Sequence, residues 1–398
     1  MAAGSGSPPL TMAILRTNVL ILATVIGATA QPREIPNPAL PGSGQSYLAA
    51  GPDGRIYLSW TEPAEAGHRL QFAVWQKESW RLLGRVAEGP NWFVNWADYP
   101  TFLPLPGDAL AAHWLEKAGG SKYSYGIKMA QRSSSASPWK ILFAPQVQKE
   151  GQYTGFVSLV ALSKGMGAAY LAPAPGGGEE DKSLRFVQFA SNGAVVSDEM
   201  LDPDVCTCCQ TSAALTDDGP IVAYRDHEPG EIRDISLVSF RNGKWGRPRT
   251  LRPDGWRINA CPVNGPALVA SGKRAAVAWY TGADEAPRVY IALSKDAGAS
   301  FGTPARVDDG MPLGRVALVA IPDGGAVASW IEKKSNGGAE IKVRRVSAEG
   351  RLGAPQGVGA VDAARKTGFP KMVLSGTKLL LTWTADRVRT VEMQVPAM

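Results

Sequence analysis

Histidine, cysteine and charged residues are scarce in this 398-residue sequence, which has 3 His, 4 Cys and 20% charged residues. It contains no His-rich zinc motif, no glycine-rich phosphate-binding motif and no serine nucleophile elbow. Its net charge of +6 is spread evenly, and no basic run alternates with aromatic residues. Nucleic acid is therefore not an expected partner, whereas a small anionic ligand is compatible with the positive charge.

Helical periodicity is also missing beyond the N-terminal region. In its place are 44 Gly, 30 Pro and 12 Trp. This composition is typical of short strands that are joined by many turns, with aromatic side chains packed between sheets. The sequence therefore predicts an all-β fold.

The N-terminal 30 residues have the pattern of a signal peptide. Arg16 supplies the positive charge, residues 19–26 form the apolar segment, and Ala28-Thr29-Ala30 is a small-residue cleavage site. An uncleaved membrane anchor is the alternative, but the apolar run is short for a bilayer span. We expect 1–30 to be removed and 31–398 to form one domain that is periplasmic or secreted, with no membrane contact after cleavage.

A sequence pattern recurs along the chain about every 54 residues. It consists of an apolar strand, a turn and a second apolar strand that ends in Trp or Tyr. The strand-ending aromatic residues are Trp60, Trp114, Tyr170, Tyr224, Trp279, Trp330 and Trp383, with spacings of 54, 56, 54, 55, 51 and 53. A second series of residues opens a further strand in the first six repeats, at Trp80, Trp139, Val195, Trp245, Phe301 and Leu352. Repeats of this length indicate a solenoid or a propeller.

Four strands in each repeat make a propeller blade, so we predict a β-propeller with seven four-stranded blades, six being the alternative. The last repeat ends after its third strand, whereas 33–37 is a strand-like piece without a blade. We expect this N-terminal strand to complete the last blade and close the ring, which would remove an exposed sheet edge.

One turn carries a recognisable motif. Ser294, Asp296, Gly298 and Phe301 match the pattern Ser-x-Asp-x-Gly-x-x-aromatic, in which Ser and Asp accept from backbone N–H groups and Gly takes a positive φ. This turn resembles the Asp-box of the sialidase (exo-α-sialidase, neuraminidase) superfamily of BNR-repeat propellers. In that architecture the boxes lie at the rim opposite the working face, so these four residues are expected to be structural.

The resemblance implies a glycosidase site, with departures from the pattern. The position of the first sialidase arginine reads Gly44-Gln45-Ser46-Tyr47, without Arg. Three arginines on adjacent blades provide a substitute carboxylate-binding cluster, because guanidinium groups match carboxylates; they are Arg225, Arg233 and Arg315. Salt bridges to nearby carboxylates are the structural alternative. By the same resemblance, Asp98 is the expected acid/base and Tyr280 the nucleophile, with Glu231 or Glu285 as its base.

The loops of the expected working face are rich in aromatic and polar residues. Trp92 and Trp96 lie between the first two blades, and Trp256 and Asn264 lie between the fourth and fifth. Aromatic rings beside polar groups are typical of carbohydrate or anion sites. The alternative for Trp92 and Trp96 is that they plug the central channel.

All four cysteines lie in two loops at equivalent phase of neighbouring repeats: Cys206, Cys208, Cys209 and Cys261. One interpretation is a structural disulfide between Cys208 or Cys209 and Cys261, as expected outside the cytoplasm. The other is a copper or zinc site made by the four thiols, with His227 as a further ligand.

Two functions follow from these patterns. The first is an exported sialidase-like propeller that binds a glycan or another anionic ligand on its loop-rich face; if it is an enzyme, it hydrolyses a glycosidic bond. The second is a periplasmic metal-binding or scaffold propeller that uses the cysteine cluster.

Overall fold

The computed structural model describes residues 1–4, 6, 31–147, 149–178, 181–335 and 337–398. The predicted signal peptide falls on 1–30, which lies almost wholly outside the described residues. No helix in the described ranges is long and apolar enough to cross a membrane.

Seven antiparallel sheets make up the protein, in agreement with the predicted seven blades. Blade 1 contains β2 (Gly44–Ala50), β3 (Ile56–Ala64), β4 (Gly67–Gln76) and β5 (Ser79–Gly89). Blade 2 contains β6 (Phe102–Pro104), β7 (Leu110–Lys117), β8 (Tyr125–Arg132) and β9 (Lys140–Phe143). Blade 3 contains β10 (Gly155–Ala161), β11 (Met166–Pro173), β12 (Lys182–Phe189) and β13 (Val195–Val205).

The remaining blades follow the same order. Blade 4 contains β14 (Ser212–Thr216), β15 (Gly219–Arg225) and β16 (Ile235–Arg241), with β17 (Lys244–Trp245) and β18 (Arg249–Arg252) both paired to β16. Blade 5 contains β19 (Ala267–Ser271), β20 (Arg274–Thr281), β21 (Arg288–Ser294) and β22 (Ala305–Arg306), with a 3₁₀ turn η1 (Ala283–Glu285). Blade 6 contains β23 (Met311–Ala320), β24 (Ala326–Lys333), β25 (Ala339–Val346) and β26 (Gln356–Val361). A 3₁₀ turn η2 (Arg365–Thr367) leads to β27 (Lys371–Ser375), β28 (Lys378–Thr384) and β29 (Val388–Gln394) of blade 7.

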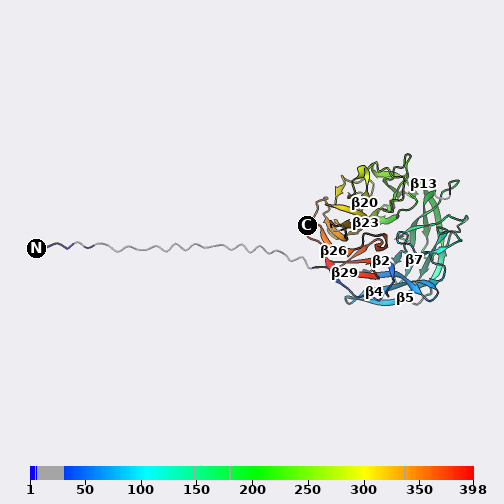
Figure 1. Cartoon of the computed structure of the whole chain (residues 1–398), viewed down its shortest axis with the longest axis horizontal. Helices are drawn as coiled ribbons and strands as arrows, with labels where there is room; N and C mark the ends of the chain where they lie inside the picture. The colour runs from blue at the N-terminus through cyan, green and yellow to red at the C-terminus, as the bar shows by residue number, and fades with distance from the viewer. Residues whose placement is uncertain (5, 7–30, 148, 179–180, 336) are drawn as a thin grey trace.

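The N-terminal strand closes the ring. Strand β1 (Arg33–Glu34) pairs with β29, with Arg33 opposite Glu392 and Glu34 opposite Val391. The Arg33 guanidinium donates to the Glu392 carboxylate at 2.9 Å across this junction. Figure 1 shows the blue start and the red end of the ring next to each other. The prediction that an N-terminal strand completes the last blade is confirmed.

The first strands of the blades line the axis, and each contacts the first strand of the next blade. The contacts run from β2 through β6, β10, β14, β19, β23 and β27, and β27 contacts β2 again. Hydrogen bonds recur at this step: the Ala213 N–H donates to Ser158 Oγ, and the Leu268 N–H donates to Ser212 Oγ. Loops about one repeat apart are thereby brought to a common mouth.

The repeated aromatic residues form the hydrophobic layers between blades. All seven lie on second strands and are buried, and Trp60, Trp279 and Trp330 have no exposed surface. The ring N–H groups of Trp60, Trp114 and Trp330 each donate to a glutamate two residues later, as where Trp330 Nε1 donates to Glu332 at 2.9 Å. The periodicity in the sequence therefore reports the packing between sheets.

Candidate functional site: an aromatic cleft and a thiol cluster

A cleft of about 450 Å³ opens at the mouth of the ring, on the face that carries the loops before the first strands. It is walled by loops of several blades, including those around Trp96, Tyr123, Tyr153, Cys261 and Arg365. The expected convergence of these loops is confirmed. A volume of about 300–1,000 Å³ is usual for small-ligand sites.

Stacked aromatic rings make the walls of the cleft rigid. The Tyr125 ring lies between Phe93 and Tyr153, with ring centroids 3.8 Å and 4.8 Å apart. Trp96 stacks on Phe369 at 5.9 Å. Tyr123 is different, because it is 50% exposed, with the Lys122 amino group 5.1 Å from the centre of its ring.

Asp98 lies at the bottom of the cleft and is almost completely buried. Its carboxylate accepts from the Phe156 N–H at 2.8 Å and from the Tyr125 hydroxyl at 3.0 Å. Burial raises the pKa of Asp98 to about 7, against the opposite effect of these two hydrogen bonds. The carboxyl group therefore titrates near neutrality, which suits proton transfer.

Gly155 makes this position of Asp98 possible. A Cβ atom at residue 155 would lie 2.0 Å from Asp98 Oδ2, far inside van der Waals contact. Only glycine leaves room for the carboxylate beside β10.

Below the cleft, the central channel contains a cavity of about 200 Å³. Ala97, Asp98 and Phe156 line both spaces. Lys371 donates to the Tyr99 hydroxyl at 2.6 Å and lies over the rings of Tyr99 and Tyr47. The residue keeps some exposed surface, but enclosure of its amino group lowers the pKa of Lys371 to about 7.

Two of the three predicted binding arginines are structural. Arg225 is buried, and its guanidinium donates to the backbone carbonyls of Asn264, Arg233 and Tyr280. Arg315 donates to the carbonyls of Ala364 and Ala363 and lies over the Trp96 ring at 5.2 Å. These donors hold neighbouring loops together, so the expected carboxylate-binding cluster is not formed by them.

The third arginine belongs to a chain of polar contacts at the edge of blade 4. Arg233 donates to Glu231 at 2.6 Å, Glu231 lies 3.5 Å from His227 Nε2, and His227 Nδ1 lies 2.8 Å from Asp204. Burial alone would lower the pKa of Arg233, but Glu231 and the nearby Cys206 raise it. Both ring nitrogens of His227 thus face carboxylates, which does not agree with its predicted role as a metal ligand.

Three residues predicted to bind ligand are packed inside the protein. Trp92 is buried and stacks on Trp114 at 6.1 Å. Trp256 is covered by Arg225 and packs edge-on against Tyr280 at 5.5 Å. Asn264 is buried and accepts the Arg315 N–H at 2.7 Å through Oδ1. Their loops lie near the mouth, but these side chains turn into the core because that is where their apolar surface or hydrogen-bonding partners are found.

The predicted nucleophile Tyr280 is held in the same packing. Burial raises its pKa, although the charge of Arg225 acts in the opposite direction. Its expected partner Glu231 is engaged by Arg233.

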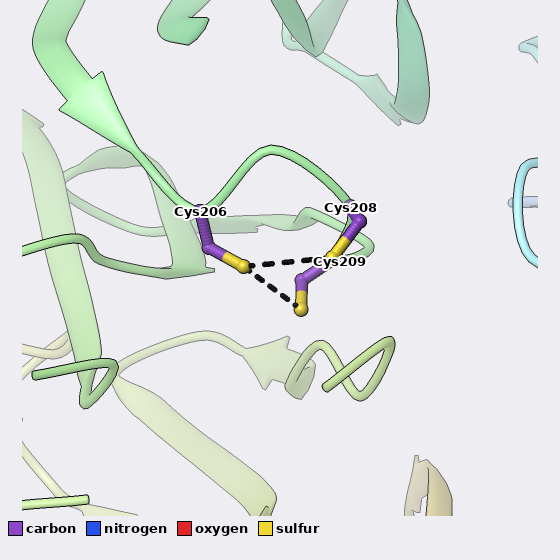
Figure 2. A group of neighbouring side chains, drawn as sticks. All are labelled: Cys206, Cys208 and Cys209. Atoms are coloured by element: carbon purple, nitrogen blue, oxygen red, sulfur yellow. Dashed lines mark hydrogen bonds between the residues drawn. The ribbon is translucent and has the colours of Figure 1, made fainter. Parts of the chain in front are cut away.

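The cysteines form a compact group (Figure 2). The Cys206 sulfur lies 3.2 Å from that of Cys209 and 3.9 Å from that of Cys208, and the three sulfur atoms all lie within 4.8 Å of one another. Cys206 and Cys209 are buried, Cys208 is half-buried, and Cys261 is exposed. All four are free thiols in the described structure, so the expected disulfide from Cys208 or Cys209 to Cys261 is not formed.

Cys261 nevertheless approaches the group from the next blade. It lines the cleft together with Cys208, whose hydrogen bond lowers the pKa of the Cys261 thiol to about 7. Hydrogen bonding with Cys208 and Cys209 holds the pKa of Cys206 well below its usual value.

The turn at 294–301 is held together by hydrogen bonds within it. Ser294 Oγ accepts from the Gly298 N–H at 2.9 Å, Asp296 accepts from the Ser300 N–H at 2.9 Å, and Gly298 has φ of +77°. Phe301 packs against the hydrophobic layer between blades 4 and 5, and Arg249 lies over its ring. None of these four residues lines the cleft or the channel.

The sequence pattern did not single out Tyr123, Tyr125 and Tyr153 in the cleft wall, nor Lys371 in the channel. Tyr123 lies in the loop between the second and third strands of blade 2, and Tyr153 precedes the first strand of blade 3. Both loops are of the kinds expected to face the mouth, so applying that expectation to every blade would have found these two tyrosines. Tyr125 and Lys371 are the first residues of β8 and β27, and only the structure shows their position.

The fold and the cleft define a β-propeller with a ligand-sized cleft on its loop-rich face. No family model and no curated protein matches the sequence. Among solved structures, it is similar to a lectin from Burkholderia pseudomallei, with a TM-score of 0.60, 11% identity, and coverage of 88% of this chain and 96% of the lectin.

Two further structures are a polysaccharide lyase (an ulvan lyase) and an α-l-arabinofuranosidase from Fusarium graminearum. The lyase has a TM-score of 0.54 at 12% identity, over 92% of this chain and 95% of the lyase. The arabinofuranosidase has a TM-score of 0.51 at 13% identity, over 92% of this chain and 98% of that chain. At these identities the likeness shows a shared fold.

Proposed function

We propose that this protein is an exported propeller that binds an acidic carbohydrate in the cleft at the mouth of its ring. The observation that carries the proposal is the aromatic wall, in which the half-exposed ring of Tyr123 lies beside the stacked rings of Tyr125 and Tyr153. The apolar C–H face of a sugar packs on an exposed ring such as that of Tyr123, and its hydroxyl groups bind to polar groups of the wall. The solved lectin and polysaccharide-processing enzymes of the same fold support a carbohydrate ligand.

The preference for an acidic sugar rests on Arg365. This residue is exposed at the edge of the cleft, with its guanidinium 5.8 Å from the centre of the Trp96 ring. Asp98, the carboxyl group at the bottom, is about half protonated at neutral pH and repels an anion less than an ordinary aspartate does. The cleft therefore presents an exposed cation to a sugar carboxylate, and the carboxyl group at its bottom repels that anion less than an ionised aspartate would.

Calorimetric titration with oligosaccharides tests the proposal, using sialyllactose and a glucuronate-containing oligosaccharide with neutral arabino-oligosaccharides for comparison. Tyr123→Ala should weaken binding about tenfold, because loss of one stacked ring costs about 1.4 kcal/mol. Ile141→Ala is the matched control, since Ile141 is 52% exposed on β9 and does not line the cleft.

Arg365→Gln should weaken acidic oligosaccharides selectively and leave neutral ones unchanged. Lys366→Gln is its control, because Lys366 is also exposed but pairs with Asp362 at 2.9 Å and does not line this cleft. Absence of binding to every oligosaccharide, or equal affinity for Tyr123→Ala and the parent protein, would contradict the proposal.

Sialidase-type hydrolysis is a second candidate, favoured by the near-neutral pKa of Asp98. Against it stand the arginines, since Arg225 and Arg315 already donate to backbone carbonyls and Arg233 to Glu231. Release of the fluorophore from a fluorogenic sialoside, lost in Asp98→Asn, would favour hydrolysis over binding alone.

Export is part of the proposal and rests on the sequence pattern of residues 1–30. N-terminal sequencing of the protein recovered outside the cytoplasm tests it. A chain that keeps residues 1–30 in the cytoplasm would contradict it.

A further inference from the structure

The sulfur atoms of Cys206, Cys208 and Cys209 have the spacing of ligands around one metal ion. Three sulfurs in a plane about 2.3 Å from a central ion lie about 4 Å from one another. The observed separations from Cys206 are 3.2 Å and 3.9 Å, and no pair in the group exceeds 4.8 Å. Small side-chain rotations would bring all three to such an ion.

We propose that these three cysteines bind a single Cu(I) ion as trigonal thiolates. Thiolate sulfur is a soft ligand and prefers soft ions such as Cu(I). Zinc in structural sites takes four ligands in a tetrahedron. The fourth donor would have to be Cys261, which hydrogen-bonds to Cys208 from another loop, but its sulfur does not lie within 4.8 Å of all three of the others. His227 is held between Asp204 and Glu231.

The charge of the surroundings fits a buried thiolate complex. Three thiolates and one Cu(I) carry net negative charge, which is costly to bury without compensation. Two buried guanidinium groups stand near Cys206, those of Arg225 and Arg233. Arg233 Nε is buried and has no hydrogen-bond acceptor among the described residues, so a thiolate at Cys206 would give it one.

These roles also explain why the two arginines lie in the interior of blade 4. They compensate a thiolate cluster instead of binding the carboxylate of a substrate. Cys208 lines the cleft wall, whereas Cys206 and Cys209 lie behind it. The ion would therefore be loaded from the cleft, each ligating thiol releasing its proton to solvent. This proposal does not depend on carbohydrate binding.

The test is an anaerobic titration of the reduced, purified chain with Cu(I) in competition with bicinchoninate. We expect one Cu(I) per chain and three sulfur neighbours by X-ray absorption. Cys206→Ser and Cys209→Ser should lose the ion, whereas Cys261→Ser should retain it. Thermal unfolding shows whether each variant is folded, and Cys208→Ser, at the half-buried position, provides a second test if a buried position does not tolerate serine.

Arg233→Gln should weaken Cu(I) binding about 10- to 100-fold, as loss of a group that supports a ligand commonly does. Arg257→Gln is the control, because Arg257 is exposed and contacts Gly230. Three results would overturn the proposal: Cu(I) binding that requires Cys261, a preference for zinc with four sulfur neighbours, or a reduced protein that binds no Cu(I). If the reduced protein binds no Cu(I), and the protein as isolated contains a Cys206–Cys209 disulfide, the group is a structural crosslink.

Discussion

Asp296 in the rim turn and Asp98 at the bottom of the cleft carry the same side chain with opposite properties. Asp296 is exposed and accepts from the side chain and backbone of Ser300, which lowers its pKa to about 2. Asp98 is buried, and burial raises its pKa to about 7 although it also accepts two hydrogen bonds. Access to water, more than the number of hydrogen bonds, makes the difference.

The carboxyl group of Asp296 is a structural group, whereas that of Asp98 is a candidate functional group. The partners of Asp296 lie within four residues in sequence, and its side chain is exposed to solvent. The partners of Asp98 are Tyr125 at the start of β8 and Phe156 at the start of β10, and ionisation of its buried carboxyl group costs free energy. Proteins retain such costly groups mainly at sites where they act.

The largest expected effect is on the pH dependence of stability in Asp98→Asn. The pKa of Asp98 is about 7 in the folded protein and 3.8 in the reference state. The protonated carboxyl group therefore contributes stability at low pH, and this contribution is lost as pH rises through 7. The parent protein should lose up to about 4 kcal/mol of unfolding free energy relative to the variant between about pH 4 and pH 7. Urea unfolding across this range measures it.

Asp296→Asn is the control with the opposite sign, because its stabilising carboxylate is lost only as pH falls toward 2. If the stability difference between the parent protein and Asp98→Asn were independent of pH, the buried carboxyl group would not titrate as described.

An intermediate effect is expected for Gly155→Ala. The new methyl group would lie 2.0 Å from Asp98 Oδ2 and 3.1 Å from Tyr125 Cε2. We expect about 1–3 kcal/mol of destabilisation from this overpacking, measured by urea unfolding. Gly246→Ala is the control, since its Cβ would meet only ordinary contacts. Recovery of part of the loss in the double variant Gly155→Ala/Asp98→Ala would attribute the strain to the carboxylate, and full additivity would contradict that assignment.

The smallest effect is expected for Asp296→Ala in the rim turn. It removes hydrogen bonds from Ser294 and Ser300 in an exposed turn, and it should cost about 0.5–1.5 kcal/mol of unfolding free energy. Oligosaccharide affinity should not change, because the turn does not line the cleft. A loss of affinity without a loss of stability would contradict the structural role of this turn.

The sequence predicted the fold and the position of the site better than it predicted individual site residues. Trp60 and Trp330 recur in the sequence because every blade packs against the next, so their spacing reports the architecture directly. Trp92, Trp96 and Trp256 are all tryptophans in loops that were expected to face the mouth. The side chains of Trp92 and Trp256 nevertheless pack inward and are buried. Side-chain direction in a loop depends on neighbours from other blades, and the sequence of the loop does not specify these neighbours.

The arginines show the same limit. Arg225, Arg233 and Arg315 lie in the predicted loops. In the structure, however, the guanidinium groups of Arg225 and Arg315 donate hydrogen bonds to backbone carbonyls. A loop with many unpaired carbonyls needs donors, and a guanidinium group satisfies several at once. From sequence, such a residue is indistinguishable from one that binds a ligand.

The sequence by itself determined the seven blades, the closing N-terminal strand and the loops that meet at the mouth, because each follows from periodicity or from a pattern within a few residues. Only the tertiary structure decided that Asp98 is buried, that three tyrosines wall the cleft, and that two arginines lie beside the thiols of Cys206, Cys208 and Cys209. The physical reason is that burial, charge compensation and ring stacking arise between residues of different blades, which become neighbours only when the ring closes.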